Sequence, residues 1–141
     1  MVEMDQLELV AEKVGMLMKA ECELLGGECL VKKQRSLVIP ARNVSVPCTL
    51  DLDISFTKFK EDGSALNKAV IYLLPEELPK FAFHLIEYPI PLPTHYQQRI
   101  SAGANIICFY MESKEPPEHF AQRLAAALDT LEQVDGPLYV N

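Results

Sequence analysis

Apolar residues follow a helical period in the first part of the chain. Between Glu3 and Leu25, leucines and valines recur at steps of three, four and seven, which places them on one face of a helix. Gly26 and Gly27 come next and predict the end of this helix, because a left-handed glycine commonly terminates a helix. Gly15 lies inside the segment and is expected to weaken the helix by about 1 kcal/mol relative to alanine.

The helical period returns near the end of the chain, where residues 113–117 can cap a helix that begins with proline. This helix is expected to run from about Pro117 to Val134 and to stop at Gly136–Pro137. Its buried stripe is expected to consist of Phe120, Leu124, Leu128 and Leu131.

Strict alternation of apolar and polar residues marks the middle of the chain. It is clearest from Cys48 to Phe59 and predicts an antiparallel strand with one wet face. The segment Glu28–Ile39 is less regular and predicts one strand or two, ended by Pro40, with Arg42–Pro47 as a connection. The apolar side of the clearest strand consists of Leu50, Leu52, Ile54 and Phe56, whereas Asp51 and Asp53 are expected on its solvated side.

A turn and a further strand are expected next, at Glu61–Gly63 and Lys68–Leu74. The apolar residues of Phe81–Tyr88 favour a strand, and an amphipathic helix from Glu76 is the rival interpretation, because Pro79 would be tolerated in the first turn of a helix.

Three prolines at alternate positions, Pro89, Pro91 and Pro93, predict an extended stretch that joins no sheet. The run Ala104–Glu112 is expected to be the final strand. These elements predict a single α+β domain over residues 1–141, with an N-terminal helix, an antiparallel β-meander of four or more strands, and a C-terminal helix packed on the sheet.

The charge balance argues against some classes of partner. With 20 acidic and 13 basic residues, the formal net charge of -7 disfavours binding to nucleic acid. No run of about 18 apolar residues predicts a membrane span, and no targeting signal is expected. We therefore expect a soluble, cytoplasmic protein that associates with neither nucleic acid nor membrane.

The four cysteines are scattered, and the histidines stand alone. Cys22, Cys29, Cys48 and Cys108 form no Cys-x-x-Cys pair, which predicts reduced thiols, no disulfide and no zinc site. No histidine has the spacing of a helical metal pair, and common phosphate-binding and hydrolase motifs do not occur. No cofactor and no metal are expected.

Several stretches of the second half resemble the ubiquitin-conjugating-enzyme fold. The stretch Phe81–Pro93 resembles the strand that leads into that family's proline segment, and Ile106–Met111 resembles the sequence around its thioester cysteine. Pro116–Pro117, the following helix and Asp135-Gly136-Pro137-Leu138 occur where the family has similar features. The chain resembles either a divergent, prokaryotic version of these enzymes or a catalytically inactive relative of the RWD type.

The resemblance implies a conjugating transferase in which Cys108 carries a ubiquitin-like protein as a thioester. Asn105 is then the candidate to stabilise the oxyanion, and the binding segment comprises Tyr88, Pro89, Pro91 and Pro93. The partners would be the ubiquitin-like protein and its activating enzyme. The apolar neighbours of Cys108 favour a different role, in which the cysteine packs in the core.

The alternative is a non-catalytic protein-binding domain, such as an adaptor or a secretion chaperone. Small acidic α+β domains with terminal helices serve in both roles, and fold alone does not decide function. In this interpretation the segment from Tyr88 to Pro93 is either a docking edge or a rigid connection. The exposure of Cys108 distinguishes the two functions.

Overall fold

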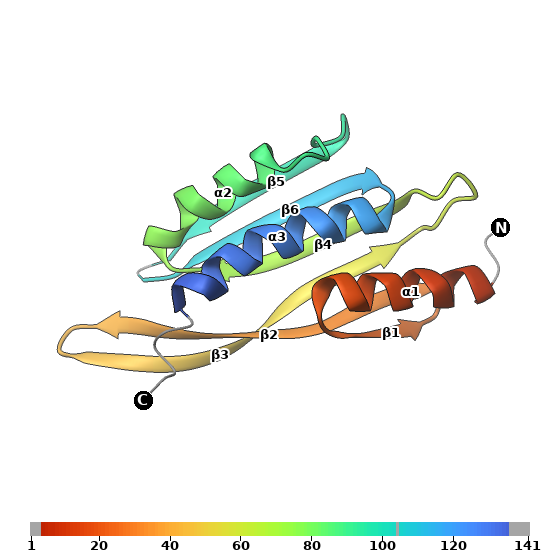
Figure 1. The fold of residues 1–141 in the computed structure, drawn as a ribbon. Coiled ribbons are helices and arrows are strands. Elements are labelled where there is room, and N and C mark those ends of the chain that lie inside the picture. Colours follow the sequence, from red (N-terminus) through yellow and green to blue (C-terminus); the bar gives the residue numbers. More distant parts are fainter. Residues whose placement is uncertain (1–3, 104, 136–141) are drawn as a thin grey trace.

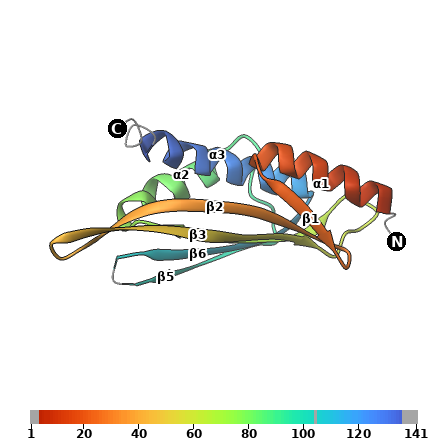
Figure 2. The same ribbon diagram turned by 90° about the horizontal axis from the view of Figure 1, so that it is seen from below.

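Three helices cover one face of a six-stranded antiparallel sheet, whose strand order is β1-β2-β3-β4-β6-β5 (Figure 1). The computed structural model describes residues 4–103 and 105–135. Seen from the side, the helices form one layer and the sheet the other (Figure 2). The elements are α1 (Met4–Met18), β1 (Glu21–Leu25), β2 (Glu28–Ala41), β3 (Val44–Thr57), β4 (Ala65–Leu73), the short 3-10 helix η1 (Pro75–Glu77), α2 (Leu78–Glu87), β5 (Tyr96–Ala102), β6 (Ile107–Glu115) and α3 (Pro117–Asp135).

This architecture confirms the predicted α+β class, and the core lies between the helices and the sheet. Phe56 of β3 meets Phe120 of α3 edge to face, with 5.9 Å between ring centroids. Of the residues predicted to be buried together, Leu50 is only half-buried, because β3 pairs with β4 from Asp53 onwards and Leu50 lies before that point. The others are buried as predicted: Leu52, Ile54, Phe56, Leu124 and Leu128.

The N-terminal helix ends earlier than the sequence predicted. It stops at Met18, and residues 21–25 form strand β1 instead of its last turns. The chain reverses at Lys19, which has a positive φ of 55°, and the N–H of Ala20 donates to the carbonyl of Gly15 at 3.0 Å. Gly26 and Gly27, also at positive φ, form the two-residue turn of the β1–β2 hairpin, so they end a strand and not a helix.

Gly15 allows this reversal, and a Cβ atom there would lie 2.9 Å from the Ala20 carbonyl oxygen. We therefore expect Gly15→Ala to lower the free energy of unfolding by about 1 kcal/mol, although alanine is the better helix former. The backbone clash costs about 1–3 kcal/mol and outweighs a propensity gain of about 1 kcal/mol. Urea denaturation measures the difference, with Glu12→Ala on the exposed side of α1 as the control. Equal or greater stability of Gly15→Ala would contradict this packing.

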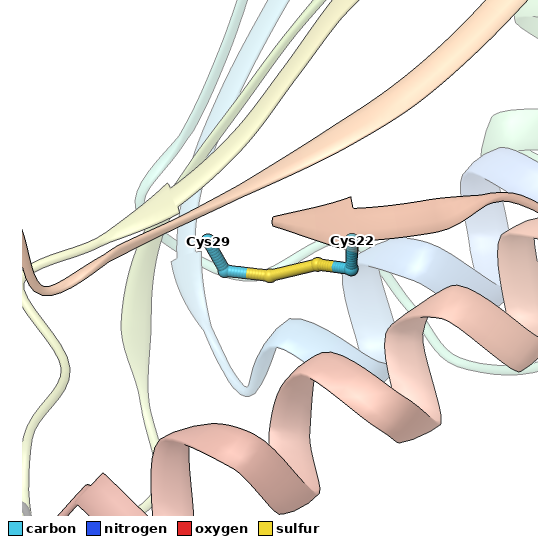
Figure 3. Close-up of a disulfide and its surroundings, with 2 residues drawn as sticks. All are labelled: Cys22 and Cys29. Carbon is cyan, nitrogen blue, oxygen red and sulfur yellow. A yellow bond between two sulfur atoms is a disulfide. The ribbon is translucent and has the colours of Figure 1, made fainter. Parts of the chain in front are cut away.

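The prediction of no disulfide is wrong for one pair of cysteines. Cys22 of β1 and Cys29 of β2 form a disulfide with Cα atoms 6.2 Å apart (Figure 3). Their strands pair so that Leu24 faces Cys29, which makes the two cysteines diagonal neighbours on the same side of the hairpin. The prediction failed because residues 21–25 were assigned to a helix. Cys48 and Cys108 are free thiols.

Strands β2 and β3 form a long hairpin that extends beyond the rest of the sheet (Figure 1). Pro40 does not end β2 but pairs with Ser45, and the predicted connection Arg42–Pro47 is mostly strand. β1 pairs with β2 only as far as Lys32, so the outer edge of β2 is unpaired from there, where a proline costs no ladder hydrogen bond. We call the protruding residues 33–41 and 44–52 the arm.

The segment after β4 follows the rival interpretation and not the favoured one. Residues 78–87 form helix α2, with Pro79 in its first turn. Phe81 and Leu85 are buried one helical turn apart, and Phe81 lies 5.1 Å from Phe109 of β6. The prediction that the proline segment after this helix joins no sheet is confirmed, since residues 89–95 belong to no helix or strand.

The last part of the chain contains a strand that the sequence did not reveal. All residues of β5 except Tyr96 are exposed, so the strand shows no apolar alternation. The final strand β6 begins at Ile107 and ends at Glu115, three residues later at each end than predicted. The predicted turn Glu61–Gly63 and the buried stripe of α3 are confirmed. The strand predicted at 68–74 is present as β4, which begins three residues earlier and ends one residue earlier. Residues 136–138, predicted to follow the helix, lie outside the described residues.

Candidate functional site

Cys108 lies on the open face of the sheet, the face that no helix of the described chain covers. In β6 it alternates with Ile107 and Phe109, which are buried beneath the helices, so its side chain points the other way. Its strand neighbours are Tyr72 of β4 and Ser101 of β5. The thiol is half-buried, so it neither belongs to the core nor is fully exposed to solvent.

Asn105, the predicted oxyanion residue, is exposed in the connection between β5 and β6. This connection is closed by a hydrogen bond from the Gly103 N–H to the Ile106 carbonyl at 2.8 Å. Asn105 therefore belongs to the tip of a hairpin, whereas Cys108 lies within its second strand. An oxyanion donor must be aimed at the reacting carbonyl, so the amide at this exposed hairpin tip would have to reach the carbonyl held at Cys108.

The proline segment is fixed on the helix side of the sheet by α3. The Tyr88 hydroxyl donates to Gln122 at 3.4 Å, and the Arg123 guanidinium donates to the carbonyls of Ile90 at 3.3 Å and Pro91 at 3.0 Å. Tyr88–Pro93 and Cys108 thus lie on opposite sides of the sheet. The structure does not bring the predicted catalytic and binding residues together.

Arg123 belongs to a buried polar cluster that the sequence analysis missed. Its two terminal nitrogens each lie 2.8 Å from an oxygen of Glu115, which also accepts a hydrogen bond from Ser113 at 2.6 Å. Arg123 is four residues before the buried Ala127 and three after Phe120, so its position on the apolar stripe of α3 was the available signal.

Tyr96 of β5 interacts electrostatically with this cluster. Burial raises the pKa of Tyr96 to about 12, with the charge of Arg123 lowering it and that of Glu115 raising it to smaller extents. Asn67 donates to Ser113 and to the Glu115 carbonyl at 3.3 and 3.0 Å, while its Oδ1 accepts no hydrogen bond from the described residues. This cluster joins β4, β6 and α3. Because its side chains are buried, it presents no reactive group to a substrate.

Other polar candidates are held by local partners. His84 Nδ1 lies 2.9 Å from the Lys80 carbonyl, and Asp51 accepts a hydrogen bond from Gln34 at 2.8 Å. Within residues 4–103 and 105–135, no three metal-ligating side chains come together. None of the helices that the structure describes is long and apolar enough to cross a membrane.

Large apolar side chains are exposed in three peripheral regions of the molecule. One region is α1 and the end of β1, another is α2 with β5, and the third is the arm. Each region includes a strand with an unpaired edge, because β1 and β5 end the sheet and the arm extends beyond its neighbours. The exposed residues are Leu9, Met16, Leu25, Val38, Val44, Val46, Phe83, Ile86 and Ile100.

These surfaces are suited to noncovalent association, because unpaired strand edges with apolar side chains nearby are places where another chain can add. The sequence did not reveal them, since β1 and β5 were not predicted as strands. Comparison with protein-family models, with curated proteins and with solved structures found no match to this chain.

Proposed function

We propose that the protein is a non-catalytic protein-binding domain, of the adaptor or chaperone-like kind. The observation that supports this best is the coincidence of exposed apolar side chains with unpaired strand edges at both ends of the sheet. Phe83 and Ile86 lie on one helix and are exposed at 58% and 64% of their surfaces. Their exposure contributes no hydrophobic stabilisation to the domain on its own. Contiguous exposed apolar surface commonly marks a protein interaction site.

Affinity capture with matched variants tests this function. The wild-type protein and three edge variants, Leu25→Glu, Ile100→Glu and Val46→Glu, are used as baits in extract from the cells that make the protein. A partner retained by the wild type and lost from one edge variant supports the proposal. Identical retained proteins for all four baits would refute it. Lys60→Glu, at an exposed position in the connection between β3 and β4, is the control for added negative charge.

The second candidate is the thioester-forming transferase implied by the resemblance to ubiquitin-conjugating enzymes. The half-exposure of Cys108 favours it over a sealed core position. Acyl transfer requires the partner's carbonyl carbon to come within about 3–3.5 Å of the sulfur. The end of the partner protein would therefore have to fit between Tyr72 and Ser101, the neighbours of Cys108 on the open face.

Alkylation of the folded protein tests this candidate. If Cys108 is a transfer nucleophile, it should react with iodoacetamide at least about tenfold faster than Cys48, which is also free and half-buried. Mass analysis of the labelled peptides gives both rates. If the two rates are equal, or Cys108 reacts only on unfolding, the catalytic role is excluded. Cys108→Ser should then leave partner capture unchanged.

A cytoplasmic location stays a prediction that accompanies this function. The Cys22–Cys29 disulfide opposes it, because disulfides form and persist mainly in oxidising compartments. Rapid alkylation of thiols in intact cells, followed by mass analysis, measures how much of this pair is oxidised where the protein is made. A fully reduced pair in cells would agree with the cytoplasm.

A further inference from the structure

An open groove runs between α1 and β1 at one end of the sheet, with a volume of about 570 Å³. Helix α1 contributes Glu8, Glu12 and Met16 to one wall, and β1 with the residue before it contributes the other. The groove is formed because the chain reverses tightly over Gly15 and returns beside its own helix. The second wall is apolar and consists of Ala20, Cys22 and Leu24.

Among the described residues, β1 pairs only with β2, so none of them pairs with the edge of β1 that borders this groove. Leu25 and Glu28 flank a two-residue turn and form the closing pair of the hairpin. In an antiparallel hairpin, hydrogen-bonded and non-bonded pairs alternate, so Cys22 and Leu24 direct their backbone N–H and C=O groups outward. The side chains of the same two residues line the groove.

The charges around this edge are acidic on both faces of β1. Glu8 and Glu12 lie one helical turn apart on the groove side. On the open face, β1 carries Glu21 and Glu23, of which Glu23 pairs with Lys32 at 3.1 Å. An added strand would therefore meet carboxylates whichever way its side chains point, and basic residues would be favoured on it.

We propose that β1 and this groove bind an extended segment of a partner protein, which adds to the sheet as a strand and combines apolar with basic residues. The inference rests on the proposed protein-binding function and specifies its partner. Backbone hydrogen bonds to β1 supply affinity, apolar side chains contact Met16 and Leu24, and lysine or arginine side chains pair with Glu8 and Glu12. A second copy of this chain fits poorly, because β1 against β1 would bring these carboxylates together.

Peptide selection on the intact, oxidised protein tests the proposal. A library of random peptides of about twelve residues, long enough for one strand, is selected on the wild type, and consensus peptides are synthesised. We expect them to combine apolar and basic residues and to lose at least about tenfold in affinity for Glu8→Lys/Glu12→Lys. The matched control is Glu76→Lys/Glu87→Lys, which makes the same charge change on exposed residues next to and within α2. It should bind the peptides as the wild type does at the same salt concentration.

Amide exchange and NMR shifts locate the bound peptide. The N–H groups of Cys22 and Leu24 should become protected, and methylating alternate peptide nitrogens should abolish binding in only one register. Peptides that bind instead at β5 or the arm would overturn this inference but leave the protein-binding function standing. Enrichment of acidic or purely apolar peptides would also overturn it. So would a homodimer of the protein that competes with the peptide for binding. Failure of any peptide to enrich, together with identical capture by all baits, would refute both proposals.

Discussion

Replacing Arg123 with methionine is expected to lower the free energy of unfolding by about 3–5 kcal/mol. The guanidinium is fully buried, and its ion pair with Glu115 has relative exposures of 0% and 5% for the two side chains. Methionine fills much of the space but donates no hydrogen bond. The Glu115 carboxylate would stay buried with Ser113 as its remaining side-chain donor among the described residues. The carbonyls of Ile90 and Pro91 would lose the Arg123 donors.

Urea denaturation followed by circular dichroism measures this loss against a typical domain stability of about 5–15 kcal/mol. The double variant Arg123→Met/Glu115→Met should recover part of it, because no unpaired buried carboxylate remains. Lys19→Met is the control, since its pair with Asp129 is exposed and spans 3.8 Å, and should change stability by less than about 1 kcal/mol. A loss below about 1 kcal/mol for Arg123→Met would contradict the buried pair.

Local patterns predicted the elements whose burial is one-sided. Helix α3 has a buried and a half-buried face, and the second half of β3 alternates between buried and more exposed residues, so their periods are visible in the sequence. β5 has almost no buried side chain, so it left no period to detect. In the segment that includes α2, Pro79 and the apolar run were compatible with both helix and strand. The burial of Phe81 and Leu85, one helical turn apart, accompanies the helix, with Phe81 against Phe109.

The candidate site was harder to predict because it depends on pairings between distant segments. Cys108 and the proline segment could be named from the sequence, but which side of the sheet each occupies follows from the strand register and from Arg123. The disulfide and the α1–β1 groove both depend on the reversal at Lys19, where a residue other than glycine adopts a positive φ. No common sequence signal marks such a position.

Replacing Arg35 with methionine is expected to free the arm from the domain as well as to destabilise it. Arg35 pairs with Leu50, three residues beyond Asp53, where β3 leaves the β4 ladder. Its NH1 group donates to the Tyr72 carbonyl at 2.8 Å and to Glu77 Oε1 at 2.9 Å. A second bond joins its NH2 group to Glu77 Oε2, and both side chains are only 7% exposed. This pair fastens the base of the arm to η1, which lies 42 positions away along the chain.

Loss of the Arg35 guanidinium leaves the Glu77 carboxylate buried with the Leu74 N–H as its remaining described donor, so we expect a cost of about 3–5 kcal/mol. Under conditions where the domain stays folded, the exchange rate of arm amides should rise above the wild-type rate by more than that of amides in the β4–β6 ladder. The reason is that the arm has lost its attachment. Hydrogen exchange measured by mass spectrometry separates the two regions.

Gln34→Met is the matched control, since it changes the neighbouring residue on the other face of β2 and removes only an exposed hydrogen bond to Asp51. It should leave arm exchange near the wild-type rate. Arg35→Met/Glu77→Met should regain part of the stability but not of the arm protection, because the buried charge is gone while the attachment is still missing. Arm exchange that is unchanged in Arg35→Met would show that other contacts, such as the burial of Leu37, hold the arm in place.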